Sequence, residues 1–388
     1  MKKNKLLSRN SGMQSSITSV MAALLCILIG LVCGFLVLVA INPAHAWGDG
    51  FVRILKGGFY DAPYGVGKML ANAAPLVMTG LSVAFAFKTG LFNIGAAGQY
   101  TLGAYGALYC AIMLKLPWFV CLLAATIMGG LWGAIPGFFK AYLNINEVIT
   151  SIMFNWIGLY LVNELIYQNG RGPMYDARST KTWNLRKNAD YAGSIIPDFG
   201  LNKMFQTNST TIAIFLAAAV AIVIWVVLNK TTFGYELKAV GLNKNAARYA
   251  GINEKKNIIL SMTIAGALAG FGAGLYYLSG VSEWNPLNST SLPAIGFNGI
   301  SVALLASSHP IGAIFSALFI SHISVGGSFL STKYYPTEVA DLISGIIIYL
   351  CAFSMLFRGK IHGLLFKNKD KTNVNAEPAS ADKKKEGK

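Results

Sequence analysis

The sequence contains few charged residues and few cysteines. Only 12% of its 388 residues are Asp, Glu, Lys or Arg, whereas 54% are apolar. Soluble domains carry about 25% charged residues, so the composition excludes a large soluble enzyme. All five cysteines lie inside apolar runs without metal-ligand spacing, and we expect them to be packing residues. They are Cys26, Cys33, Cys110, Cys121 and Cys351.

Motifs for catalysis and nucleotide binding are missing as well. The nearest approach to the phosphate-binding loop G-x-x-x-x-G-K-[ST] is Gly67-Lys68-Met69, and Ala62 stands in place of its first glycine. The four histidines are scattered, and the sequence contains neither H-E-x-x-H nor G-x-S-x-G. We therefore expect no catalytic residue, no metal site and no cofactor.

The dominant feature is a series of long apolar runs. They predict an all-α, polytopic membrane protein with about ten transmembrane helices, because each run can cross about 30 Å of hydrocarbon. The runs at 293–308 and 310–325 are short and contain glycine, so we expect broken or re-entrant segments that are buried in protein or line a cavity. The ten runs are 17–41, 66–87, 91–114, 117–139, 147–168, 210–228, 258–279, 293–308, 310–325 and 338–357.

The basic residues indicate the orientation of these helices. The net charge is +16, and with a cytoplasmic N-terminus and ten crossings 21 of the 32 Lys and Arg residues face the cytoplasm. This distribution follows the positive-inside rule and predicts that both termini are cytoplasmic. Because the basic residues flank apolar runs, they serve as topology signals, and we expect no nucleic-acid partner.

We expect one membrane domain between two polar ends. Residues 1–16 are predicted to be a cytoplasmic segment, residues 17–357 the transmembrane domain, and residues 358–388 a disordered basic tail in the cytoplasm or on anionic lipid headgroups. The first residues imitate a signal peptide, with Ala44-His45-Ala46 as a cleavage-like site. The apolar stretch of about 25 residues exceeds the 7–15 of a signal peptide, so we expect an uncleaved first helix.

Glycines at helical spacing predict close contacts between membrane helices. Small residues four apart lie on one face of a helix and let two backbones approach each other in lipid. These residues are Gly30 with Gly34, Gly133 with Gly137, and Gly266 with Gly270 and Gly274.

The acidic residues near the apolar runs all lie within a turn or two of a predicted helix end. They are Glu147, Glu164, Glu338 and Asp341. An ion-driven carrier commonly needs an ionisable side chain deep in the membrane. We therefore expect the energy for transport to come from another polypeptide, with an ion-driven secondary carrier as the less favoured alternative.

A polar segment, residues 229–257, separates the sixth and seventh runs. Asn243 suits a helix N-cap, residues 244–250 are compatible with a short helix, and Gly251 fits the left-handed position after it. Its small residues and Tyr249 suit docking into a groove of a soluble partner. An ordinary solvated loop explains the pattern equally well.

Four blocks of the sequence resemble a known family. The first, G-x-N-x-x-A-A-x-Y-A-G-I, begins at Gly241, and the others lie at 92–99, 146–155 and 296–304. They are similar to blocks in the permease subunits of ATP-binding-cassette importers for sugars, nucleosides and branched-chain amino acids. The likeness extends in order over roughly residues 65 to 330. Ala97 departs from it, because many members carry glutamate there, and we assign no charged role to this position.

The resemblance implies that residues 229–257 form a coupling loop whose short helix sits in a cleft of the ATPase subunit. Nucleotide binding would move this helix and tilt the attached membrane helices, so that the cavity changes the side to which it opens. Glu236 and Arg248 are candidates for polar contacts with the ATPase, or are ordinary surface residues. The implied coupling residues are Glu236, Gly241, Asn243, Ala246, Ala247, Arg248, Tyr249 and Gly251.

Four amide side chains within apolar runs are candidates for the substrate pathway: Asn93, Gln99, Asn155 and Asn298. An amide in lipid without a partner is costly, so each should face another helix or a wet cavity. Hydrogen bonding between helices is the commoner explanation for any single one. Uncharged amides suit a neutral hydroxylated or heterocyclic solute, and the similar sequences around Asn93 and Asn298 hint at two related halves.

Within the family, the outer loop at 169–208 and the long N-terminal extension look most like nucleoside importers. The resemblance implies the permease subunit of a bacterial nucleoside importer in the cell membrane, which is not itself an enzyme. Simple sugars such as ribose or galactose are the alternative cargo. The implied partners are an ATPase subunit, a second identical or homologous permease, an extracellular solute-binding protein, a small neutral solute and membrane lipid.

Overall fold

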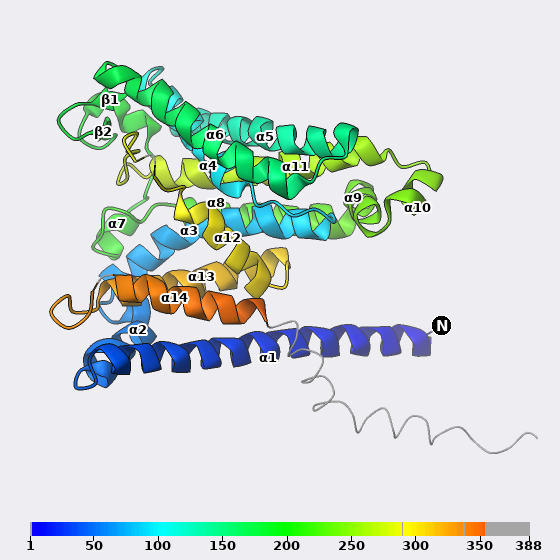
Figure 1. The fold of residues 1–388 in the computed structure, drawn as a ribbon, viewed down its shortest axis with the longest axis horizontal. Helices are drawn as coiled ribbons and strands as arrows, with labels where there is room; N and C mark the ends of the chain where they lie inside the picture. The colour runs from blue at the N-terminus through cyan, green and yellow to red at the C-terminus, as the bar shows by residue number, and fades with distance from the viewer. Residues whose placement is uncertain (1, 289, 337, 354–388) are drawn as a thin grey trace, which may run out of the picture.

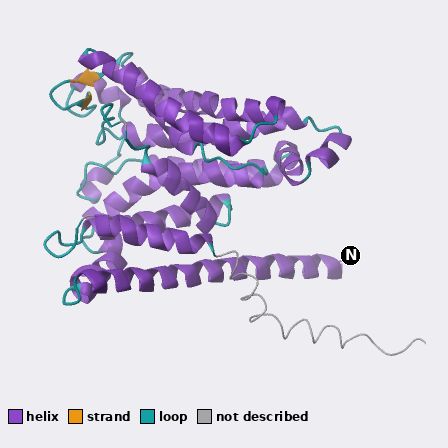
Figure 2. Cartoon of the chain, in the orientation of Figure 1, coloured by secondary structure: helices purple, strands orange, loops and turns teal. Residues whose placement is uncertain are grey.

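A computed structural model describes residues 2–288, 290–336 and 338–353 of the chain. Helices run side by side along one direction, and a small β-hairpin lies at one end of the bundle (Figures 1 and 2). In this hairpin β1 (Tyr175–Asp176) pairs antiparallel with β2 (Lys181–Thr182). We call this end the hairpin end, and the opposite end, which carries α10 and the start of α1, the α10 end (Figure 1). The predicted tail at 358–388 lies outside the described residues.

Among the residues that the structure describes, seven helices are long and apolar enough to cross a membrane. Seven such helices are typical of a polytopic membrane protein, which confirms that part of the predicted fold class. They are α1 (Lys2–Ile41), α3 (Tyr64–Lys88), α5 (Trp118–Leu143), α6 (Glu147–Tyr167), α8 (Ala213–Lys230), α11 (Glu254–Tyr277) and α13 (Pro310–Ser328).

Three more helices coincide with predicted apolar runs but are shorter. They are α4 (Ala96–Ile112), α12 (Ala294–Leu305) and α14 (Glu338–Ala352). With 12 residues, α12 rises only about 18 Å, less than the hydrocarbon thickness, as expected for a broken segment. In contrast, α13 is a continuous helix of 19 residues, so the expectation of a second broken segment at 310–325 was wrong. The count of ten crossings stays a prediction.

Short elements occupy the connections between these helices. Those at the hairpin end include α2 (Arg53–Lys56) and α7 (Leu201–Met204). The π-helix η1 (Ala46–Val52) and the 3-10 turns η2 (Gly57–Phe59), η3 (Gln168–Gly170) and η4 (Ala189–Ser194) complete these connections, while α9 (Thr232–Leu242) and α10 (Lys244–Tyr249) join α8 to α11.

Helix α3 is the centre of the bundle. Every residue from 73 to 86 is buried, so all faces of the helix contact protein, as expected for a helix that is apolar all round. The outer helices instead leave one apolar stripe exposed. On α5 this stripe consists of Phe119, Leu123, Ile127 and Leu131, four residues apart. Such a stripe is stable against lipid chains, whereas water would disfavour it.

The predicted glycine contacts are confirmed at the crossings of the helices. A Cβ atom placed on Gly133 of α5 would lie 2.5 Å from the carbonyl oxygen of Met262 on α11. On α11, a Cβ atom on Gly266 would lie 2.3 Å from the carbonyl oxygen of Gly129. Gly30 of α1 likewise touches the backbone of Ile347 on α14. These helices therefore pack backbone against backbone.

The acidic residues lie at helix ends, as predicted. Glu147 is the first residue of α6, and Glu164 is three residues from its end. Glu338 is the first residue of α14, and Asp341 lies in its first turn. Neither helix therefore has one of these acidic residues in its central turns.

Replacing Gly133 with leucine should lower the free energy of unfolding by about 1–3 kcal/mol or more, the usual cost of overpacking. The added side chain would push α5 away from α11, because backbone atoms of α11 occupy the space. The measurement is the thermal unfolding midpoint of the purified protein in detergent. Gly193→Leu is the control, since a Cβ atom there meets nothing within 4 Å. Equal midpoints for the two variants would contradict the packing described here.

Candidate coupling surface and solute pathway

Side-chain caps at Thr231, Asn243 and Asn253 divide residues 230–256 into the end of α8, the helices α9 and α10, and the start of α11. Thr231 accepts a hydrogen bond from the backbone N–H of Gly234 at 3.0 Å and caps α9. Asn243 accepts one from Ala246 at 3.0 Å and caps α10. The predicted cap at Asn243 and the short helix after it are therefore confirmed. Helix α9 was not predicted.

Helix α10 ends in a defined turn at Gly251. This residue has φ +81°, the left-handed conformation that glycine adopts without strain. The N–H of Ile252 donates to the carbonyl of Ala247, and the N–H of Gly251 donates to that of Arg248, both at 3.0 Å. These two bonds form a Schellman motif. Capped at both ends, α10 is held in one shape although it has only six residues.

Among the described residues, the two most exposed large apolar side chains lie at the α10 end. Tyr249 is 95% exposed and Leu242 is 88% exposed, whereas Ala247 between them in sequence is buried. Solvated apolar side chains on a rigid element indicate a surface for a protein partner. Tyr249 was a predicted coupling residue, but Leu242 was not. The pattern gave no sign of its exposure, because a leucine at the end of a helix usually packs inward.

The remaining predicted coupling residues differ in their exposure. The exposed ones are Asn243, Ala246, Arg248 and Gly251, and the half-buried ones are Glu236 and Gly241. In particular, Gly241 belongs to the last turn of α9 and therefore precedes the predicted short helix.

Gly241 lies against the connection between α3 and α4, residues 89–95. A Cβ atom on Gly241 would lie 2.4 Å from the carbonyl carbon of Thr89, and one on Gly90 would lie 2.3 Å from the Cα atom of Gly241. The two backbones therefore touch with no side chain between them. Gly90 has φ +76°, which also favours glycine. This contact links the exposed helices to the centre of the bundle.

The amide of Asn93 in the α3–α4 connection and the amide of Gln99 at the start of α4 bind each other. Asn93 Nδ2 donates to Gln99 Oε1 at 2.7 Å, and Gln99 Nε2 donates to Asn93 Oδ1 at 3.0 Å. Asn93 also donates to the hydroxyl of Ser82 on α3 at 2.9 Å. Both amides are fully buried. They satisfy each other in the interior, where an unpaired amide would be costly.

Asn155 on α6 binds the same connection through backbone atoms. Its Oδ1 accepts from the N–H of Gly98 at 2.8 Å, and its Nδ2 donates to the carbonyl of Ile94 at 3.0 Å. Asn298 on α12 differs, because it is half-buried and its side chain has no hydrogen bond to a described residue. Three of the four amides thus fit hydrogen bonding between chain segments. Asn298 stays a candidate for the solute pathway, because its polar atoms are free. The similar sequences around Asn93 and Asn298 therefore lie in different environments.

All four blocks that resemble the permease family meet at this connection. Asn155 brings the 146–155 block onto the 92–99 block. At the start of α12, a Cβ atom on Gly296 would lie 2.4 Å from the Cα atom of Ala97, which brings in the 296–304 block. Gly241 brings in the block of α9 and α10. The α3–α4 connection is therefore the point at which these separate parts of the chain are joined.

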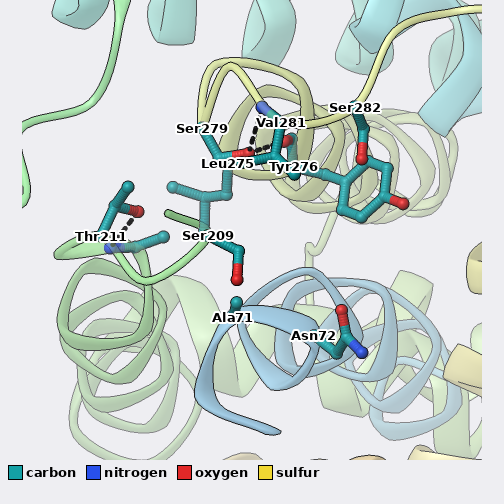
Figure 3. Close-up of a pocket in the computed structure, with 10 residues that line it drawn as sticks. Ala71, Asn72, Ser209, Thr211, Leu275, Tyr276, Ser279, Val281 and Ser282 are labelled. Carbon is teal, nitrogen blue, oxygen red and sulfur yellow. Dashed lines mark hydrogen bonds between the residues drawn. The ribbon is translucent and has the colours of Figure 1, made fainter. Parts of the chain in front are cut away.

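A pocket lies between α3, the start of α8 and the end of α11, toward the hairpin end (Figure 3). Its accessible volume is about 70 Å³, it opens to the outside, and all ten lining residues are uncharged. Its residues come from three elements far apart in sequence, so no local motif signalled it. The polar ones are Asn72, Ser209, Thr211, Tyr276, Ser279 and Ser282.

The sequence is similar to known permeases. The profile of the family described as "Branched-chain amino acid transport system / permease component" matches residues 65–352. The guanosine ABC transporter permease protein NupP of Bacillus subtilis is 32% identical over 89% of this chain and 97% of its own length. The nucleoside ABC transporter permease protein NupB of Lactococcus lactis is 32% identical, with 89% of this chain and 93% of NupB covered. The glucose ABC transporter permease protein TsgB13 of Haloferax volcanii is 30% identical, with 92% of each chain covered. No solved structure matches the chain significantly.

Replacing Asn155 with alanine should lower stability by about 1–3 kcal/mol for each buried group left unpaired. The N–H of Gly98 and the carbonyl of Ile94 would both lose their partner. Thermal unfolding in detergent measures the effect. Asn298→Ala is the matched control and should change the midpoint little, because no described residue binds that amide. A loss at Asn298 as large as that at Asn155 would contradict the assignment.

Proposed function

This chain belongs to the permease family of the branched-chain amino acid transport system, and from that premise we propose that it forms the membrane pathway of an ATP-driven nucleoside importer. The observation that carries this proposal is the similarity, over nearly the full length of both chains, to permeases named for guanosine and nucleosides. Members of this family are transport components and not enzymes. The similarity to a glucose permease supports simple sugars as the second candidate.

The uncharged polar groups of the interior support a neutral cargo. The pocket at the hairpin end and the amide of Asn298 offer donors and acceptors without a fixed charge. A phosphate or dicarboxylate would instead need Arg or Lys at its binding site. Nucleosides and sugars both meet this condition, and only a nucleoside adds a planar heterocycle.

The helices α9 and α10 form the surface that receives the ATPase subunit in this proposal. Tyr249 and Leu242 would enter a groove of the ATPase, and the flanking basic residue Arg248 would contact its polar rim. Movement of α10 would reach the α3–α4 connection through the backbone contact between Gly241 and Gly90. From this connection the amide hydrogen bonds would carry the movement to α4 and α6. The close contact of Gly296 with Ala97 would carry it to α12.

We further propose that the α10 end faces the cytoplasm and the hairpin end faces outward. The segment that joins α8 to α11 is rich in Lys and Arg, in agreement with the positive-inside rule. The start of α1 lies at the same end (Figure 1). In this proposal the chain crosses the membrane ten times, and its apolar stripes face lipid. A second identical or related permease lies beside it, and a solute-binding protein docks at the hairpin end.

The cargo is tested by uptake in cells that express the complete transporter. Radiolabelled guanosine and uridine should accumulate in an ATP-dependent manner, and unlabelled glucose in tenfold excess should compete weakly. Strong competition by glucose together with negligible nucleoside uptake would overturn the nucleoside assignment in favour of the sugar alternative.

The coupling route predicts different defects for Tyr249→Ala and Gly241→Ala. Loss of a central aromatic anchor costs about 1–2 kcal/mol or more, so Tyr249→Ala should weaken association with the ATPase about tenfold. Gly241→Ala should leave that association intact but lower uptake severalfold, because the added Cβ atom separates α9 from the α3–α4 connection. Co-purification of the ATPase and nucleoside uptake are the two measurements.

Phe215→Ala is the control for both variants, since this exposed phenylalanine lies on α8 among the lipid-facing residues. It should change neither measurement. Normal ATPase association in Tyr249→Ala, or normal uptake in a well-folded Gly241→Ala protein, would contradict the route.

A further inference from the structure

The pocket at the hairpin end lies where a solute would first meet the membrane domain. It is formed by the third turn of α3, the residues that precede α8 and the last turn of α11 with the residues after it. Figure 3 shows Asn72 on α3 facing Tyr276 and Ser282 across the opening, with Ser209 and Thr211 on the other side. None of the predicted pathway amides lines this pocket.

The polar groups on one side of the pocket are engaged by the protein itself. Ser209 pairs with the hydroxyl of Thr207 at 2.8 Å, and Ser279 donates to the carbonyl of Tyr276 at 2.7 Å. The hydroxyl of Thr211 accepts from the N–H of Ala213 at 3.3 Å. These hydroxyls stabilise the turns that shape the pocket.

The polar groups on the other side are free. Within the described residues, the side chains of Asn72, Tyr276 and Ser282 have no hydrogen-bond partner. The ring of Tyr276 is half-buried and is held edge-on to Tyr277, with the ring centroids 5.1 Å apart. The pocket therefore presents an oriented aromatic ring between an amide and a hydroxyl that are both available to a ligand.

This combination selects a ligand of a definite chemistry. The ring offers a stacking surface for a planar heterocycle. The amide supplies a donor and an acceptor, and the hydroxyl can act as either, which suits sugar hydroxyls. All lining residues are uncharged, so a charged ligand would lose hydration without gaining a counter-ion. The accessible interior of about 70 Å³ is smaller than a typical small-molecule site, so a ligand would rest partly in the open mouth rather than be enclosed.

We propose that this pocket is a receiving site for the neutral nucleoside, with the base against Tyr276 and the sugar hydroxyls on Asn72 and Ser282. The inference rests on the proposed function and adds to it a site and its contact residues. Because the mouth is open and only three groups are free, the site binds the solute weakly and passes it on.

Labelling of an introduced cysteine tests this directly. Val281→Cys, at a lining residue to which the proposal assigns no contact, is modified from solution in the complex of permeases and ATPase with a small methanethiosulfonate reagent. Guanosine at millimolar concentration should slow the modification at least threefold, and guanosine monophosphate at the same concentration should not. Ser179→Cys, in the turn between β1 and β2 outside the pocket, is the matched control and should react equally fast with and without guanosine.

A second substitution identifies the contact. In the Val281→Cys background, Tyr276→Ala should abolish the protection by guanosine, while Tyr160→Ala, at an exposed tyrosine on α6, should preserve it. Unchanged labelling by guanosine in a complex that does transport guanosine would overturn the site and leave the proposed function standing. Absence of both guanosine and uridine transport by the parent complex would refute the proposed function, and this inference with it.

Discussion

The proposed coupling between the ATPase surface and the membrane helices depends on the backbone contact between Gly90 and Gly241. This contact is the place where the exposed helices α9 and α10 meet the interior of the bundle without an intervening side chain. A contact of this kind transmits displacement because no rotamer can absorb the movement. On its inner side the α3–α4 connection is bound by Ser82, Gln99 and Asn155, so a displacement there reaches three helices together.

The rest of the bundle suits this role because it is packed closely. In lipid no hydrophobic force drives helices together, so their association depends on close backbone approach and on hydrogen bonds between helices. Helices α4, α5 and α11 meet at Gly103, Gly129 and Gly270, where a Cβ atom on any one would meet backbone of another. Packed interiors move between discrete arrangements rather than deforming continuously. A small shift at α10 would therefore move whole helices.

Local features were predictable from the sequence, and long-range ones were not. The cap at Asn243, the left-handed Gly251 and the glycine faces of α5 and α11 follow from spacing and backbone preference, which act over a few residues. The contact of Gly90 with Gly241 and the pocket at Tyr276 each join segments more than 60 residues apart in the sequence. The local pattern of one segment does not indicate which other segment it contacts. The buried amides were singled out correctly as interior groups. That three of them bind each other or nearby backbone depends on how α3, α4 and α6 are arranged.

The central claim is that the work of transport enters through α9 and α10 from a separate ATPase. The most direct measurement is guanosine accumulation in proteoliposomes that contain the permease complex with or without the ATPase subunit, each with ATP and an uncoupler. Accumulation should require both the ATPase and ATP and should survive the uncoupler. Accumulation by the permease alone, driven by a proton or sodium gradient, would contradict the account.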